Sequence, residues 1–482
     1  MRSASWRRLL SSPQEVLGLD LRSLALLRIG LGLSLVLDLL YRARFLEAHY
    51  SDAGILPRAL LREAHPDVAL FALHSLSGAV GYQALLFGIA LVFAVLLLVG
   101  YRTRIAGIAS WVLLVSLHFR HPFVVDGGSN ELRILLFWSL FLPLGERFSI
   151  DARRRQERAR RAPLHASAAS AALLTQVAVI YFFAGLAKSG PRWWVYGNAL
   201  RWAVVDPAFA QPLAYVVARF PELLRVLSFG VLTVELVGPL LLFCPLWNGP
   251  IRTLVCASLM ALQVGIGLTI WVWLFPLTSV AGLAGLLPGW FWERLPERWQ
   301  GPRAEPRAAA PARAGPLARA RDAFLLAALA WVLIVNVASR VERIALPHWF
   351  LAPGAPIKLD QNWRMYAAPR RVEIRYDFLG ITRDGRRVSL ADEGPGEAWQ
   401  VVRAIQSDYH FRQSQFMLRW RVVSESLKLG YARWLCRQWN ADAPPERGLV
   451  SLDLIALSRH LRLDGAHHSW RADRVFSHRC EP

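Results

Sequence analysis

The sequence is poor in charged residues and has few lysines and cysteines. Charged residues make up 19% of its 482 residues and hydrophobic residues 54%, whereas about 25% charged residues is usual in a soluble domain. The four cysteines include no CxxC pair, which excludes a zinc ribbon and a thioredoxin-like motif. The only lysines among the 56 basic residues are Lys188, Lys358 and Lys428. This composition predicts a membrane protein.

Other common signals are also missing. The sequence has no internal repeat of solenoid length. Its start is polar and basic, and the first long apolar run begins near Leu24, so we expect no cleavable signal peptide. The net charge of +21 could suit a nucleic-acid binder, but the arginines cluster between apolar segments, as is typical of membrane topology. We therefore predict membrane lipids, and no nucleic acid, as partners.

Long apolar runs are abundant. Crossing the hydrocarbon takes about 20 mostly apolar residues in a helix. Candidate spans are 24–41, 81–100, 105–118, 131–145, 166–188, 223–245, 251–275, 277–292 and 322–340, of which the third, fourth and eighth are short. We predict an all-α polytopic membrane helix bundle of about nine spans, followed by a smaller α+β extra-membrane C-terminal domain. The predicted domains are a membrane domain (1–292), a Pro/Ala/Arg-rich cytoplasmic linker (293–321), a last transmembrane helix (322–342) and a non-cytoplasmic C-terminal domain (343–482).

The arginines predict an orientation. With a cytoplasmic N-terminus, the segments on that side hold 21 arginines, and the loops on the other side hold 8. An excess of basic residues marks the cytoplasmic side. We therefore expect an integral multi-pass membrane protein with a cytoplasmic N-terminus and a C-terminal domain outside the cytoplasm, in the periplasm of a bacterial cell.

The C-terminal domain shows strand and helix patterns. VEIRYDFLGITRDGRRVSL alternates like strands around an Asp384-Gly385 hairpin turn, and 398–439 has helical spacing. Cys436 and Cys480 could pair if this domain lies in an oxidising compartment. The histidines of HFRHPF and of HHSWRADRVFSHRC lack metal-ligand spacing, so we predict no metal site.

Ionisable groups inside spans are costly, so each is a candidate site. For Arg28, Asp38 and Arg133, an ion pair or surface anchor is favoured over chemistry. Glu235 lies mid-span, and Gln263 lies at similar depth. Glu235 favours site lining, whereas Gln263 is equally consistent with a hydrogen bond between helices.

Lys188 is the strongest catalytic candidate. It is the only lysine of the membrane portion, at the end of the apolar run VAVIYFFAGLAK. A desolvated lysine can become a neutral amine base, whereas arginine keeps its proton. The alternative is an interfacial anchor beside Trp193 and Trp194.

These motifs resemble the HTTM (horizontally transferred transmembrane) domain family, which is related to vitamin K-dependent gamma-carboxylase. The similarity covers most of residues 18–292. The segments that carry it are SLALLRIGLGLSLVLDLLYR, HYSDAGILP, GGSNELRILLFWSLFLPLGERFSID, IYFFAGLAKSGPRWWVYGNAL, VELVGPLLLF and GLTIWVWLFPL.

The resemblance implies a site and a cofactor. Lys188 matches the carboxylase lysine that acts as base on reduced vitamin K. The resemblance thus implies a reduced quinone as cofactor and a peptide or protein substrate. Aromatic side chains such as Tyr181, Phe182, Trp193 and Trp194 would pack on the quinone ring.

Two positions depart from the family. Glu146 and Gln263 stand where the carboxylase has functional histidines, and a glutamate cannot replace a neutral imidazole without a change of charge. The complete carboxylase mechanism is therefore not implied, while quinol-linked chemistry stays open. The alternatives to an enzyme are a non-catalytic scaffold or sensor with an outward binding domain, and a transporter whose pathway Glu235 and Gln263 would line.

Overall fold

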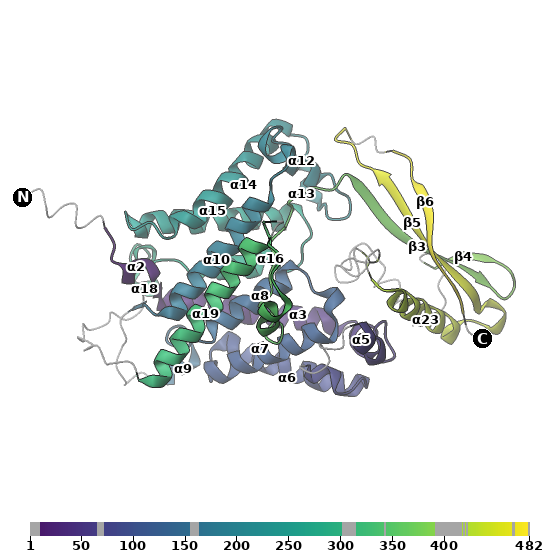
Figure 1. Cartoon of the computed structure of the whole chain (residues 1–482), viewed down its shortest axis with the longest axis horizontal. Helices are drawn as coiled ribbons and strands as arrows, with labels where there is room; N and C mark the ends of the chain where they lie inside the picture. Colours follow the sequence, from purple (N-terminus) through teal and green to yellow (C-terminus); the bar gives the residue numbers. More distant parts are fainter. Residues whose placement is uncertain are drawn as a thin grey trace, which may run out of the picture.

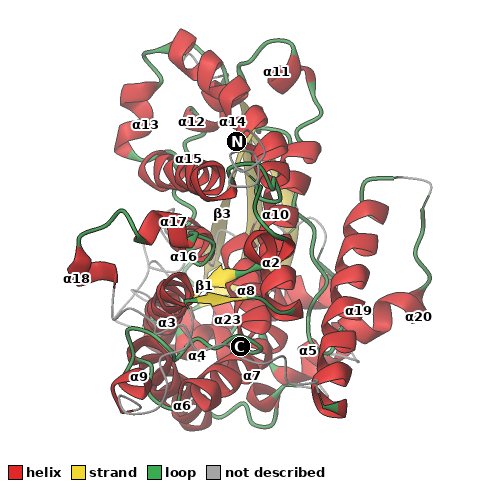
Figure 2. Cartoon of the chain, turned by 90° about the vertical axis from the view of Figure 1, so that its left-hand side faces the viewer, coloured by secondary structure: helices red, strands yellow, loops and turns green. Residues whose placement is uncertain are grey.

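We describe a computed structural model of the chain, in which residues 10–64, 72–154, 163–300, 315–341, 344–390, 417, 420, 423–464 and 468–480 are described. Figure 1 shows a helical part and, to its right, a smaller part that contains a β-sheet. Turned by 90°, the sheet lies behind the helices (Figure 2). The predicted class, a helical bundle followed by an α+β domain, is confirmed at this level.

In the described part of the chain, six helices are long and apolar enough to cross a membrane. They are α3 (Leu21–Ala43), α6 (Val80–Val99), α10 (Ala168–Ala187), α14 (Pro221–Leu241), α15 (Asn248–Thr269) and α19 (Pro316–Ala338). The other three predicted spans overlap only in part with α7 (Thr103–Arg120), α8 (Gly127–Ser139) and α16 (Phe275–Ala284). Because these three helices are not among the six of membrane length and composition, nine full spans are not confirmed.

Shorter helices connect the long ones. They are α2 (Pro13–Leu17), α4 (Leu46–Tyr50), α5 (Arg58–Ala64), η2 (Leu73–Ser75), η3 (Pro122–Val124), α9 (Ile150–Arg154), α11 (Pro191–Trp194), α12 (Ala199–Val204), α13 (Pro212–Val217), α17 (Gly289–Trp292), α18 (Glu297–Gln300), α20 (His348–Leu351) and η4 (Ala352–Gly354). A two-stranded sheet pairs β1 (Leu19–Asp20) with β2 (Leu164–His165). Within the predicted linker, 301–314 lies outside the described residues, and α19 begins at Pro316.

Helix α10 is the centre of the bundle. Of its most apolar 18 residues 78% are buried inside the protein, against 28% for α19. Ser167 begins α10 with a reciprocal capping box, which supplies partners for backbone N–H groups that the first helical turn leaves free. The side chains that α10 presents at its C-terminal end are therefore held in a well-packed position.

The chain after α19 returns into the bundle. Leu359 and Trp363 belong to the same buried core as α10, beyond the predicted start of the C-terminal domain at 343. Gln361 and Gln176 of α10 exchange hydrogen bonds at 2.7 and 3.1 Å, and the Trp138 indole donates to Gln176 at 3.0 Å. The non-helical backbone around Gln361 is tolerated inside the bundle because it is buried in protein.

The described residues of the C-terminal domain form a four-stranded antiparallel sheet that is accompanied by helix α23. The strand order is β4-β3-β5-β6, with β3 (Val372–Thr382), β4 (Arg387–Ser389), β5 (Leu449–His460) and β6 (Arg471–Arg479). The predicted hairpin between β3 and β4 is confirmed, with Gly385 at φ +79° in the turn. Helix α23 (Glu425–Asp442) ends near residue 439, where the predicted helix also ends, and η5 (Pro445–Arg447) follows. The predicted helical residues 398–416 lie outside the described part.

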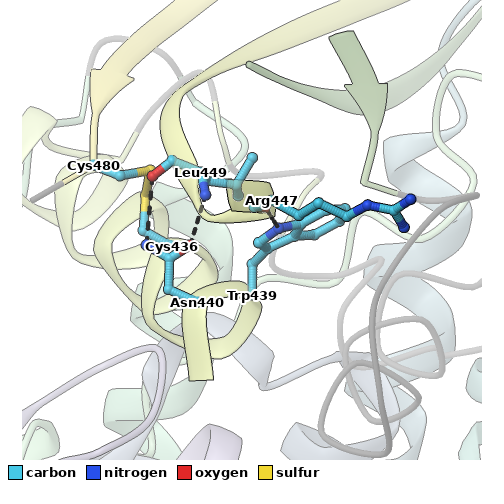
Figure 3. Close-up of a disulfide and its surroundings, with 6 residues drawn as sticks. All are labelled: Cys436, Trp439, Asn440, Arg447, Leu449 and Cys480. Atoms are coloured by element: carbon cyan, nitrogen blue, oxygen red, sulfur yellow. Dashed lines mark hydrogen bonds between the residues drawn. A yellow bond between two sulfur atoms is a disulfide. The ribbon is translucent and has the colours of Figure 1, made fainter. Parts of the chain in front are cut away.

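A disulfide joins α23 to the end of β6. Cys436 and Cys480 are bonded, with Cα atoms 5.7 Å apart, as Figure 3 shows. Beside the disulfide, the Asn440 side chain accepts a hydrogen bond from the Leu449 N–H at 2.7 Å. The pairing that the sequence left open is therefore present.

Candidate functional site

Lys188 lies inside the bundle and is paired with Glu235. Its ammonium donates to the Glu235 carboxylate at 2.5 Å and to the Ala184 carbonyl at 3.3 Å. The two side chains are only 4% and 8% exposed. An interfacial anchor would extend its amine into water or headgroups, so this burial argues against the anchor interpretation.

Gly185 explains how the pair forms. A Cβ at this position would lie 3.1 Å from the Glu235 Cβ and 3.0 Å from the Leu236 side chain. A glycine here lets α14 approach α10 closely enough for one carboxylate to reach the amine at the end of α10. The sequence Gly185-Leu-Ala-Lys188 thus supplies both the close contact between the helices and the lysine that is paired across it.

Two tryptophans surround Lys188. The amine lies 5.4 Å from the centre of the buried Trp193 ring, where a cation is attracted to the face of the ring. The indole of Trp194 donates to the Lys188 carbonyl at 2.6 Å, although Trp194 itself is 54% exposed. Trp193 therefore lies against the Lys188 amine, whereas Trp194 is hydrogen-bonded to the Lys188 backbone.

A second buried polar group lies on the same helix. Tyr181 precedes Lys188 by seven residues, two helical turns, and so lies on the same face of α10. Its hydroxyl accepts a hydrogen bond from Gln263 at 3.1 Å and interacts with Ser279. Ser279 in turn donates to the buried carboxyl of Glu131 at 2.6 Å.

Glu131 was not predicted as a site residue. The sequence contains a signal for it, since Glu131 begins the predicted span 131–145, two residues before Arg133. Gly128 makes the contact possible, because a Cβ there would lie 2.9 Å from the Phe275 backbone. Helices α8 and α16 therefore touch at their first turns, and Glu131 meets Ser279 one turn further in.

A pocket of about 390 Å³ lies beside the first turns of α8 and α16. Its apolar lining includes Phe209, Val272, Phe275, Met365 and Tyr366. The Trp193 indole, which contacts the Lys188 amine, donates to the Tyr366 carbonyl at 3.2 Å. Through Trp193 the pocket is one side chain away from the Lys188–Glu235 pair.

The pocket also contains two buried carboxyls. Asp126 begins α8 and accepts from the Ser129 N–H at 2.9 Å. Burial raises the pKa of Asp206 above its usual range, although Arg370 and the Ala208 N–H oppose this shift. The pocket therefore combines an apolar wall with carboxyl groups that could bind a polar substrate.

Three predicted site residues lie elsewhere. Arg28 donates to the Phe148 carbonyl at 2.6 Å, and Glu146 lies in the turn that follows α8 at the end away from the pocket. Arg133 donates to the Lys358 carbonyl at 3.0 Å and contacts His118. The structure brings Lys188, Glu235 and Trp193 together, with Tyr181 and Gln263 nearby, but places these three residues in other contacts.

No cluster of three potential metal ligands occurs within the described ranges. A family model for the HTTM domain matches residues 18–281. No curated protein and no solved structure gives a significant match to the chain. The family match covers more than half of the chain and, with the six helices of membrane length, identifies a multi-pass integral membrane protein.

Proposed function

Because the chain belongs to the HTTM domain family, we propose that it is a membrane enzyme in which the Lys188–Glu235 pair removes a proton from a reduced quinone. The observation that carries the proposal is the burial of a lone lysine against a carboxylate in the membrane domain. A structural ion pair could equally be built with arginine, which this chain uses almost everywhere else.

The pair can supply a neutral amine. In water, proton transfer from an ammonium to a carboxylate is strongly unfavourable, because both ions are well solvated. Burial penalises both charges at once, so transfer from Lys188 to Glu235 becomes much less costly. The resulting amine has a free lone pair that can accept a proton from a hydroxyl, while Glu235 holds the first proton.

The surrounding residues suit a quinol. The Gln263 side-chain oxygen is buried without a hydrogen-bond partner among the described residues, and it could accept from a ligand hydroxyl. Trp193 and Tyr181 offer aromatic surface for a ring. When bound, a reduced quinone would supply an acidic hydroxyl and the reducing electrons.

We further propose that the C-terminal domain lies outside the cytoplasm and presents a peptide or protein substrate. The segments predicted to lie on the same side as the N-terminus hold most of the arginines, and such an excess marks the cytoplasmic side, which supports this orientation. The Cys436–Cys480 disulfide supports it independently, since disulfides persist mainly in oxidising compartments.

The test is quinol-dependent oxygen consumption by purified protein in lipid nanodiscs. Lys188→Ala should lower the rate at least about 100-fold, the usual contribution of a general base. Lys188→Arg should be equally inactive, because the guanidinium keeps the positive charge but cannot act as a base.

Lys358→Ala is the matched control. It also removes a half-buried lysine, whose amine lies 4.4 Å from the Phe119 ring, and it should keep the wild-type rate. Equal rates for all four proteins would refute the base. A wild-type protein without quinol turnover that takes up or binds a solute would favour the transporter or scaffold interpretation.

A further inference from the structure

A second pocket lies between the helical bundle and the C-terminal sheet. It has a volume of about 690 Å³ and is lined by Arg201 and Trp202 of α12 and by residues beside the sheet, among them Arg371, His460, Arg462 and His468. The Arg201 guanidinium donates to the Leu463 carbonyl at 3.2 Å, so the two parts of the chain touch here. The lining also holds one carboxylate, Asp464, which is paired with Arg462 at 2.6 Å, so Arg201 and Arg371 supply the remaining arginine charge of the pocket.

Two arginines lie against the Trp202 ring, and Arg201 and Arg371 line the pocket together with this ring. The guanidinium carbons of Arg192 and Arg371 lie 5.4 and 5.9 Å from the ring centre, and Arg201 is adjacent in sequence. None of these three has a carboxylate within salt-bridge distance in the described part of the chain. The arginines therefore hold an excess positive charge.

The structure offers this charge little compensation. The Nε–H of Arg201 is buried and has no acceptor among the described residues. Partial burial and the nearby positive charge of Arg371 lower the pKa of Arg192. Holding like charges together is unfavourable unless an anion joins them, and guanidinium groups match phosphate oxygens in pairs.

The neighbouring surface indicates the source of the anion. Helices α11 to α13 and their connections expose large apolar and aromatic side chains to the surroundings: Trp194, Val195, Tyr196, Tyr215, Val216 and Phe220. Aromatic residues of this kind concentrate where a protein meets the headgroup region of a bilayer. The arginines thus lie beside a surface suited to membrane contact.

We propose that Arg192, Arg201 and Arg371 form a binding site for the phosphate of an anionic phospholipid headgroup. The bound lipid would join the bundle to the C-terminal sheet, because the phosphate would contact α12 and the start of β3 together. The site is separate from Lys188 and does not depend on the chemistry proposed there.

The test measures binding of a fluorescent short-chain phosphatidylglycerol to the full-length protein in neutral detergent. The double variant Arg201→Gln/Arg371→Gln should weaken binding at least about ten-fold, which corresponds to about 1.4 kcal/mol. The charge-matched control is Arg471→Gln/Arg474→Gln, which removes two guanidiniums of β6 whose nearest carboxylates are Asp473 and Asp453. The control should bind like the wild type.

Competition identifies the ligand. Failure of millimolar inorganic phosphate to displace the lipid from the wild type supports a headgroup site. Displacement of the lipid from both the wild type and the control would instead identify soluble phosphate as the ligand of the same arginines. Equal lipid affinity in the double variant and the control would overturn the proposal. Binding of a polyglutamate peptide in place of lipid would also overturn it.

Discussion

The Lys188–Glu235 pair gives a quantitative prediction about stability. Both side chains are nearly inaccessible to water, at 4% and 8% exposure. Removing one partner of such a pair leaves the other charge buried without compensation, which costs about 3–5 kcal/mol. We therefore expect Lys188→Met and Glu235→Leu each to lower the free energy of unfolding by about this amount.

The double variant should be much less destabilised. Replacing both ions by apolar side chains removes the cost of desolvating them, so the double variant should lie within about 2 kcal/mol of the wild type. The coupling energy of this cycle would then be at least about 4 kcal/mol, above the usual 0.5–3 kcal/mol of contacting residues. Retained stability with lost quinol turnover would separate the chemical role from folding.

The assay is reversible unfolding in mixed micelles, followed by tryptophan fluorescence, with denaturing detergent as the variable. Each variant is measured at the same protein and lipid concentration, because bound lipid also shifts apparent stability. If each single variant loses less than about 1 kcal/mol, as exposed pairs do, the amine is solvated and our argument from burial fails. Additive losses in the double variant would equally contradict it.

Three further predictions follow from other parts of the fold. Cys480→Ser should destabilise the C-terminal domain by about 4 kcal/mol, because its bond to Cys436 spans a separation of 44 residues; urea unfolding with and without reductant measures this. Gly128→Ala should cost about 1–3 kcal/mol, because its Cβ would lie 2.9 Å from the Phe275 backbone, and a melting temperature equal to that of wild type would contradict it. Burial, with Arg120 and Arg42 nearby, lowers the pKa of His74 to about 3. As the pH falls below about 6.5, the unfolded chain should therefore bind a proton at His74 that the folded chain does not bind, which lowers the free energy of unfolding by about 2 kcal/mol at pH 5. The melting temperature of His74→Gln should fall less steeply over that range than the melting temperature of the wild type.

The sequence singled out Lys188 and Glu235 separately, because each residue conflicts with its apolar surroundings. A lone lysine at the end of an apolar run and a glutamate within another are costly in a membrane, and the structure brings Lys188 and Glu235 into contact. The sequence could not show that they meet, since 47 residues separate them. That contact depends on the close packing of α10 and α14 at Gly185.

Arg133 and Glu131 show the limit of this reasoning. Both are ionisable and lie two residues apart, but Arg133 donates to the carbonyl of Lys358 while Glu131 lies against Ser279. A helical step of two residues points side chains to different faces. Only the positions of the neighbouring helices decide which face is structural and which adjoins the candidate site.

In the C-terminal domain, local turn chemistry was more informative than strand patterns. The Asp384-Gly385 turn predicted the β3–β4 hairpin. Strands β5 and β6 were not predicted, although LVSLDLIALSRH alternates apolar and polar residues. β5 pairs with β3 from Val372 to Thr382, a contact between distant segments that no local signal encodes.

The return of residues 359–363 into the bundle has a consequence for biosynthesis. The side-chain amide of Gln176, near the middle of α10, is hydrogen-bonded to Gln361, 185 residues later. All the helices of membrane length up to α19, and the chain beyond α19 as far as Gln361, must therefore be synthesised before the interior of the bundle is complete. A chain truncated just after α19 would leave the Gln176 side chain without Gln361. We expect membrane quality-control proteases to degrade such a chain.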